Sequence, residues 1–418
     1  MKKILITLYL FFLTTAPLPA IKLPIFTICS FFIIGYFLVN LLTNRKIIVD
    51  KYVLLLFLCL IVVVSISIVL APEYVPLPGT ISFYIKILFL SLWGISTFDL
   101  ICRLEASQLY VIYYKSVFVM SFIGIILYIL NYFGINTSTG VYTQFYIPRL
   151  QAFSQEPQGF AGFALLSYGI WHYYGDIIYS NFLRYFSIVV ISIAILLTFS
   201  PVPIIVMSLY IIYKISKNGF IATLAMVATM VVVIMLNLDF FPYYYDIKFG
   251  SNILEASGTT RLHFWRVAWR EYLEHPFSGV GPEGYGYYYD QFKLGLRDSE
   301  VFPQPPQNIV LGILANFGTI GGLYFIIFFI FPLIYLWLSR KTLDIETKTS
   351  IIIFILILIL NMQIWAFTSQ TLWFFLLLLY SRLHFMRHNP EKLQTSCQSG
   401  ATTDSRTSNL VVYGTITN

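Results

Sequence analysis

Arginine and histidine side chains recur at helical spacing within residues 259–274. His263, Arg266, Arg270 and Glu274 follow one another at intervals of 3, 4 and 4, which predicts one polar face of a helix. A guanidinium group donates parallel hydrogen bonds that suit phosphate and carboxylate oxygens. The stretch therefore indicates contact with an anion, either a substrate or the phosphates of membrane lipids beneath an amphipathic helix.

The start of this predicted helix holds one more arginine, Arg261. We expect Thr259 or Thr260 to cap the helix, so that Arg261 falls in the first turn, where the helix dipole disfavours a cation. An anion should compensate that charge. The compensating group is either an anionic substrate, which we favour, or a salt-bridge partner such as Glu255 or Asp246.

The same predicted helix has an apolar face, and a glycine-rich turn follows its end. The apolar positions, at intervals of 3, 4 and 3, are Leu262, Trp265, Trp269 and Tyr272. His275-Pro276 should end the helix, because proline restricts the preceding residue to extended conformations. The glycines at 279, 281 and 284 superficially form G-x-G-x-x-G, but they follow a helix and not a strand, which argues against a dinucleotide site. Gly279 and Gly281 instead predict a turn where backbones approach closely.

Other polar and aromatic side chains stand where the chain meets apolar segments. Tyr285 begins a tyrosine cluster that either anchors at a membrane interface or offers rings to a sugar. Gln307 and Asn308 are amides at the mouth of a predicted bundle. Arg149 and Glu156, seven residues apart, precede another apolar segment and are either substrate-binding residues or interface anchors.

The rest of the chain is predominantly apolar. Of its 418 residues, 58% are hydrophobic and 11% are charged, whereas soluble domains carry about 25% charged residues. We therefore expect an all-α polytopic membrane protein of about twelve transmembrane helices, each needing roughly 20 residues. The expected spans are 4–20, 21–41, 52–71, 81–98, 109–131, 158–175, 185–200, 202–214, 219–238, 315–338, 350–367 and 369–384.

The lysines and arginines of the short loops alternate consistently from one side to the other, which predicts that both termini are cytoplasmic. The net charge of +7 reflects these loops, so nucleic acid is not an expected partner. The expected parts are helices 1–9 with outer loop 132–157 (residues 1–238), a large extracytoplasmic loop carrying helix 259–274 (239–314), helices 10–12 (315–384) and a disordered cytoplasmic tail (385–418). The first helix, which resembles a signal peptide, lacks a clear cleavage site and should be retained.

No cofactor or metal site is predicted. The four cysteines are scattered, and no P-loop motif is present. Lys86 and Lys115 fall inside apolar spans and should extend their ammonium groups toward an interface. No acidic residue falls at the middle of a predicted span, which weighs against an ion-coupled transporter.

Taken in order, these segments resemble the O-antigen polymerase and ligase superfamily. The family pattern is R-x-x-x-W, P-x-x-G-x-G, an Asn preceded by His or Pro two positions before, and G-x-x-G. Its counterparts here are Arg261 with Trp265, Pro276 with Gly279 and Gly281, Gln307-Asn308, and Gly318 with Gly321. The earlier element R-x-x-x-F-x-x-E-P, which favours polymerases over ligases, is present as Arg149, Phe153, Glu156 and Pro157.

The resemblance implies a metal-independent, inverting glycosyltransferase of the bacterial cytoplasmic (inner) membrane. Such an enzyme transfers a polyprenyl-diphosphate-linked oligosaccharide onto an acceptor sugar hydroxyl at the outer face. A polymerase of O-antigen or a related surface polysaccharide is favoured. A ligase acting on lipid A core or protein and a lipid-linked oligosaccharide flippase remain alternatives. The implied partners are lipid-linked donor and acceptor, membrane lipid, a chain-length regulator and a separate flippase.

The resemblance also implies residue roles. Arg149 and Arg261 would stabilise the diphosphate leaving group, and Glu156 would act as base, with His263 as second choice. Residues expected to support substrate binding are Arg266, Arg270, Gly279, Gly281, Tyr285, Gln307 and Asn308. Many members carry His directly before the Asn. The amide of Gln307 cannot act as a base, which leaves it an orienting role.

Overall fold

A computed structural model describes residues 2–12, 25–43, 47–72, 75, 77–135, 140–144, 147–152, 157–218, 257–282, 284–286, 306–338, 343–362 and 367–388. The chain is mostly helical. The helices are α1 (Lys2–Phe12), α2 (Ile25–Leu42), α3 (Lys51–Val69), α4 (Leu77–Cys102), α5 (Ala106–Tyr132), α6 (Pro157–Ile178), α7 (Asn181–Leu197), α8 (Pro201–Asn218), α11 (Ser257–Glu274), α13 (Ile309–Phe325), a π-helical turn (Ile326–Ile330), α14 (Phe331–Leu338), α15 (Ile345–Asn361) and α16 (Gln370–His388).

Within these ranges, helices long and apolar enough to cross a membrane cover Lys51–Val69, Leu77–Cys102, Ala106–Tyr132 and Ile309–Leu338. Shorter apolar helices cover Thr27–Leu42, Phe182–Leu197 and Val202–Ile211. These positions agree with expected spans, but the total of about twelve stays a prediction. The expected span 219–238, most of the loop 239–307 and the tail beyond residue 388 lie outside the described residues.

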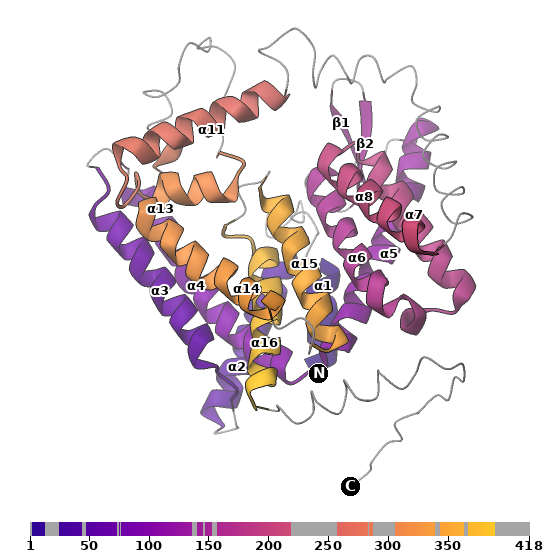
Figure 1. Ribbon diagram of the computed structural model, residues 1–418, viewed down its shortest axis with the longest axis horizontal. Coiled ribbons are helices and arrows are strands. Elements are labelled where there is room, and N and C mark those ends of the chain that lie inside the picture. Colours follow the sequence, from indigo (N-terminus) through magenta and orange to yellow (C-terminus); the bar gives the residue numbers. More distant parts are fainter. Residues whose placement is uncertain are drawn as a thin grey trace.

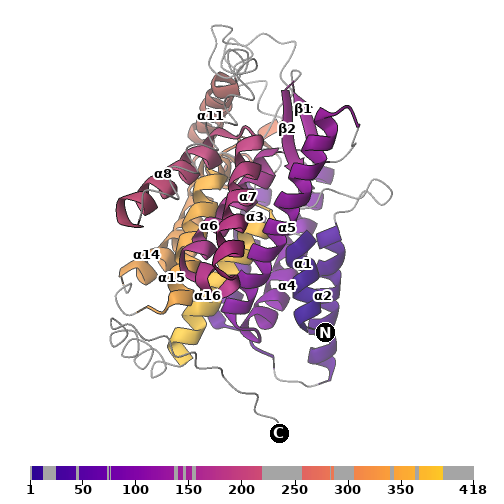
Figure 2. The same cartoon turned by 90° about the vertical axis from the view of Figure 1, so that its right-hand side faces the viewer.

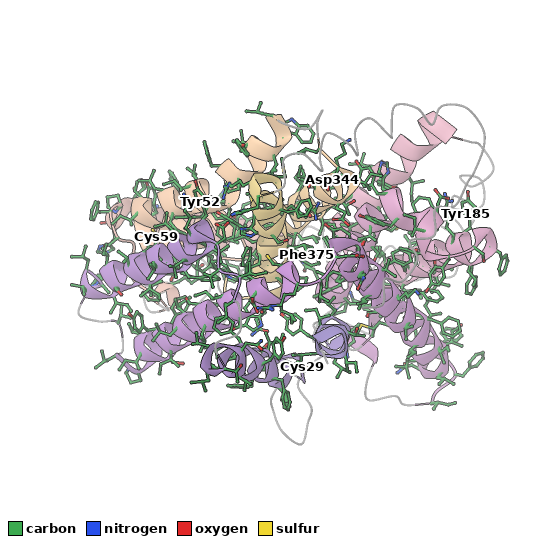
Figure 3. The ribbon with its side chains drawn as sticks, turned by 90° about the horizontal axis from the view of Figure 1, so that it is seen from below. Cys29, Tyr52, Cys59, Tyr185, Asp344 and Phe375 are labelled. Carbon is green, nitrogen blue, oxygen red and sulfur yellow. The ribbon has the colours of Figure 1, made fainter. Side chains whose placement is uncertain are left out.

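The core of the bundle surrounds α16. Residues 372–383 of this helix are all buried, and the Trp373 ring lies 5.5 Å from that of Phe57 and 5.3 Å from that of Phe329. Phe375 lies among the helices when the molecule is viewed along the bundle (Figure 3). A helix that is buried on all sides explains why its sequence is apolar all round.

A small β-hairpin departs from the all-α expectation. Strands β1 (Gly140–Gln144) and β2 (Ile147–Ala152) pair antiparallel, with Tyr142 opposite Arg149. The hairpin falls inside the expected outer loop 132–157. Its β2 strand packs on α5, where a Cβ at Gly124 would lie 3.0 Å from the Ala152 side chain. The absence of a side chain at Gly124 lets the hairpin rest directly on the helix.

The two ends of the bundle differ chemically. The α11 helix and the hairpin lie at one end, and the beginning of α1 and the end of α16 lie at the other (Figures 1 and 2). The second end carries ion pairs, among them Arg103 with Asp99 at 2.8 Å and His384 Nδ1 with Asp50 at 2.7 Å. Asp344, which pairs with Arg382, is labelled in Figure 3. The described parts of the two expected outer loops, the hairpin and α11, therefore lie at the same end of the bundle.

Candidate functional site

The α11 helix begins two residues earlier than expected and ends where expected. It runs from Ser257 to Glu274, and His275-Pro276 follows directly. The expected caps at Thr259 or Thr260 are therefore wrong, and position 261 lies in the second turn. This change weakens the dipole argument for Arg261, because the dipole acts mainly within the first turn.

The buried face of α11 also differs from the expected one. Phe264, Val267 and Ala268 are buried, whereas Trp269 is 47% exposed. Phe264 and Ala268 pack against Ala315 of α13 and Tyr285. Small and medium side chains let the two helices approach, while the large indole stays at the periphery, where amphipathic aromatics are favoured near a membrane interface.

The arginines of α11 lie on two different sides of the helix, relative to its contact with α13. Arg266 and Arg270 are exposed on the outer side of the helix. Position 261 precedes Phe264 and Ala268 by three and seven residues, so it shares their side of the helix. The side chains of Arg261 and His263, and the whole of Glu156, lie outside the described residues, so their predicted roles remain predictions.

The α13 helix is broken at Gly318, and the loop after α11 fills the break. Gly318 has φ 61° and ψ −156°, a conformation that is essentially restricted to glycine. Val280 N donates to Ala315 O (2.8 Å) and Gly281 N to Asn316 O (3.1 Å). Thr319 N donates in return to Pro276 O (2.8 Å). The loop thus satisfies backbone groups that the break would leave unbonded.

Glycines make this crossing possible, which confirms the expected close approach of two backbones. Gly279 has φ +68°, and a Cβ there would lie 2.4 Å from the carbonyl carbon of Asn316. Gly281 has φ +89°, and a Cβ there would lie 2.8 Å from the Ala71 side chain. From α3, Ser67 Oγ lies 2.8 Å from Ser278 O. The motifs P-x-x-G-x-G and G-x-x-G, about 40 residues apart in sequence, thus meet in one structural unit.

The two amides at the start of α13 have structural roles. Asn308 is the N-cap of the helix, and its Oδ1 accepts from Val310 N (3.0 Å) and Leu311 N (3.1 Å). Gln307 adopts φ +47°, which is uncommon for a residue with a side chain. Asn308 is buried, with 4% of its surface exposed. Capping therefore explains Asn308 without a substrate, and substrate contacts by either amide stay predictions.

Arg149, on β2, contacts the end of α7. Its Nε donates to Thr198 O (2.9 Å), and Nη2 lies 3.3 Å from Ser200 Oγ. A cation is favourable beside the carbonyls at a helix C-terminus. Arg149 therefore ties the hairpin to the α7–α8 turn, and any contact with a substrate anion must coexist with these bonds.

Tyr285 is buried rather than presented as a flat surface. Its ring packs in the cluster with Phe264 and Ala315, and its hydroxyl donates to Phe264 O (3.3 Å). In this arrangement Tyr285 holds the loop against α11.

The part of the chain that the structure describes contains no group of three or more His, Cys, Asp or Glu side chains suited to a metal ion.

Glu271 is the residue that the sequence reasoning missed. Its side chain is fully buried on the α13 side of α11, and neither carboxyl oxygen has a hydrogen-bond partner among the described residues. Loss of hydration raises the pKa of Glu271 to about 9. Its spacing of four residues from Val267 and three from Ala268 places it on the same face of α11 as these buried residues. The expected apolar face, which was built on the aromatic residues, does not include it.

Docking of α11 is expected to weaken as pH rises from about 5 to 9. Within that pH range the docked helix holds a proton on Glu271 that the undocked helix releases. The free energy that favours docking should therefore fall by up to about 1.4 kcal/mol per pH unit. Above about pH 9 the dependence should level off. Hydrogen exchange of α11 amides, corrected for intrinsic rates, would measure it, and Glu271→Gln should remove the slope.

Glu274→Gln is the matched control, because Glu274 is exposed three residues further along the same helix. Segment 309–318 of α13 has no titratable side chain, and His275 and Tyr285 are the titratable groups of the described loop. An unchanged slope in Glu271→Gln, or the same change in Glu274→Gln, would assign the pH dependence to another group.

One family of known proteins matches a range of the chain that includes this site. Residues 186–326 match the model of a family described as O-antigen ligase. No curated protein matches the sequence. The matched range contains α11, the loop 276–281 and the break in α13, but not the hairpin. The family is a membrane glycosyltransferase-like enzyme family. Residues 186–326, which include α11 and α13, are thus similar to the O-antigen ligase family, in agreement with the superfamily that the ordered motifs predicted.

Proposed function

We propose that this protein is a glycosyltransferase that polymerises polyprenyl-diphosphate-linked oligosaccharide units into O-antigen or a related surface polysaccharide. The reaction takes place at the outer face of the bacterial cytoplasmic membrane. The observation that carries the proposal is the unit formed by α11, loop 276–281 and α13, which joins an arginine-bearing helix to a membrane bundle within the range that is similar to the O-antigen ligase family.

The chemistry requires stabilisation of a diphosphate leaving group. An acceptor hydroxyl oxygen attacks the anomeric carbon of the donor, the bond from that carbon to the diphosphate oxygen breaks, and the hydroxyl proton passes to a base. Negative charge develops on the lipid diphosphate, where preorganised guanidinium groups act most strongly. Arg261 is the proposed main donor, with Arg266 and Arg270 as exposed supporting cations and Arg149 as a further candidate.

Glu156 is the proposed base. Gln307 stands where many superfamily members have His, and an amide cannot accept the proton. Glu271 is a poor base at neutral pH, because burial raises its pKa to about 9 and keeps it protonated. Its burial, ten residues along α11 from Arg261 or roughly 15 Å of helix, favours a structural role.

A ligase is the second candidate, because the matching family is described by that activity. The element Arg149, Phe153, Glu156 and Pro157, together with Gln307, favours the polymerase. The two activities differ in the acceptor. A polymerase uses another lipid-linked unit, whereas a ligase needs lipid A core or a protein.

Purified protein in liposomes is expected to convert lipid-linked single repeat units into longer lipid-linked chains without any other acceptor. Deletion of the gene should correspondingly leave glycans of one repeat unit on the lipid carrier or core. Gel separation of labelled glycans would measure both. Transfer only after lipid A core is added would identify a ligase, and long chains persisting in a deletion strain with no second polymerase would exclude the proposal.

A further inference from the structure

Ser67, near the C-terminal end of α3, forms hydrogen bonds outside its own helix. A serine hydroxyl inside a membrane-spanning helix commonly donates to the carbonyl four residues before it. Ser65 does so here, with its Oγ 2.8 Å from Ile61 O. Ser67 Oγ instead donates to Ser278 O (2.8 Å), in the loop after α11, and to Asn316 O (2.7 Å), in α13. One hydroxyl of α3 thus contacts both segments of the crossing between that loop and α13.

This contact is shielded from water, because Ser67, Ser278 and Asn316 are all buried. A hydroxyl has one hydrogen, so the two carbonyls share it. Water does not compete for a hydrogen bond between buried groups, and loss of the hydroxyl would leave a buried carbonyl without its donor. The Ser67 hydroxyl therefore draws the loop and α13 toward the same point on α3.

The end of α3 meets the loop at a second position. A Cβ added at Gly281 would lie 2.8 Å from the side chain of Ala71, which follows α3 by two residues, and 3.6 Å from Ser67 O. The α3 helix lies beside α13 (Figure 1) and is long and apolar enough to cross a membrane. It joins the α11–α13 unit to the bundle from outside the matched range 186–326.

We propose that Ser67 is a positioning residue for the transfer reaction. Its hydroxyl fixes loop 276–281 and the end of α13 before Gly318 to α3, and through the loop it holds α11, which carries Arg261, at the end of the bundle. The inference rests on the proposed function, to which it adds a residue that none of the ordered motifs contains.

A positioning role predicts an effect on kcat more than on KM. A displacement of about 1 Å can cost a factor of about 100 in rate. The charge that the arginines stabilise develops in the transition state, so a misplaced α11 lowers kcat. Binding of the substrate before reaction also draws on its lipid chain and sugars, which this contact leaves untouched.

The test compares the full chain with two variants in liposomes that contain lipid-linked single repeat units. Ser67→Ala is expected to lower kcat about 10-fold, with KM changed less than about 2-fold. Ser67→Cys should lose most of the same activity, because its thiol is similar in size but is a weak donor. Ser65→Ala is the matched control and should keep wild-type rates, because the Ser65 hydroxyl contacts Ile61 O and the Tyr84 hydroxyl instead.

Hydrogen exchange supplies a second measurement that does not depend on activity. The amides of Val280 and Gly281 donate to Ala315 O and Asn316 O across the crossing. In Ser67→Ala these two amides should exchange about 2- to 10-fold faster, which corresponds to the net free energy of one hydrogen bond. Ser65→Ala should leave their exchange unchanged.

Unchanged exchange in Ser67→Ala would overturn the inference, as would an equal loss of activity in Ser65→Ala. Faster exchange with a wild-type kcat would make Ser67 a structural residue alone, and a wild-type kcat in Ser67→Cys would assign its effect to packing; both results contradict a positioning role of the hydroxyl. Failure of the proposed function looks different, because the wild-type protein itself would then extend no lipid-linked units.

Discussion

Arg261→Ala is expected to abolish extension of lipid-linked glycans, with a loss of rate of about 100-fold or more and an unchanged protein level. Arg261→Lys should lose most of the activity as well, because lysine keeps the charge but not the pair of parallel hydrogen bonds that a diphosphate accepts. Residue 261 lies on the side of α11 that contains Phe264 and Ala268. The helix dipole contributes little there, because residue 261 is in the second turn.

Arg266→Ala and Arg270→Ala are the controls, because both side chains are exposed on the other side of the same helix. Milder losses are expected from these variants. Glu156→Gln should match Arg261→Ala if Glu156 is the base. The measurement is glycan chain length together with the initial rate in liposomes. Wild-type chains from Arg261→Ala would remove Arg261 from the site, and wild-type chains from Arg261→Lys would reduce it to a general positive charge.

Local signals allowed the sequence to predict several features correctly. Proline restricts the residue before it, so the end of α11 at Glu274 could be located from His275-Pro276. The positive φ angles of Gly279 and Gly281 follow from the need for residues without a Cβ in a tight crossing. Continuous apolar runs likewise located α3, α4 and α5.

Contacts between segments far apart in the sequence could not be predicted from such local patterns. The expected apolar face of α11 contained Trp269, but the actual contact surface is set by the small Ala315 on a helix 40 residues or more away. Gly318 likewise contacts the backbone of Phe277, which is distant in sequence. The hairpin at Arg149 was missed because two short strands give little periodic signal beside long apolar spans.

Glu271 shows a different limit. A glutamate in a helix that also carries arginines suggests a solvated ion pair, and no local pattern indicates full burial without a partner. Spacing from Val267 and Ala268 indicates which face of α11 it shares, but its lack of a hydrogen-bond partner among the described residues emerges only when α11 is placed on α13. Sequence patterns thus identified which segments matter, whereas the chemical state of this carboxyl required the packing.

Gly279→Ala and Gly318→Ala are each expected to lower the amount of folded protein and its melting temperature. Each should reduce the free energy of unfolding by roughly 2–6 kcal/mol. At Gly279, a Cβ would lie 2.5 Å from Ala315 O, and at Gly318 it would lie 2.3 Å from Phe277 O. Both obstructing atoms are backbone, which cannot rotate away as a side chain can. Both glycines also have positive φ angles that alanine disfavours.

Gly286→Ala is the matched control, because it lies in the same loop and a Cβ there would have no atom within 4 Å. Thermal unfolding in detergent would measure the three variants. A wild-type melting temperature for Gly279→Ala would mean that the loop does not fill the break in α13. The double variant gives a sharper test, since both alanines disrupt one crossing and the second should cost much less than it does alone. Fully additive losses would instead indicate two independent sites of strain.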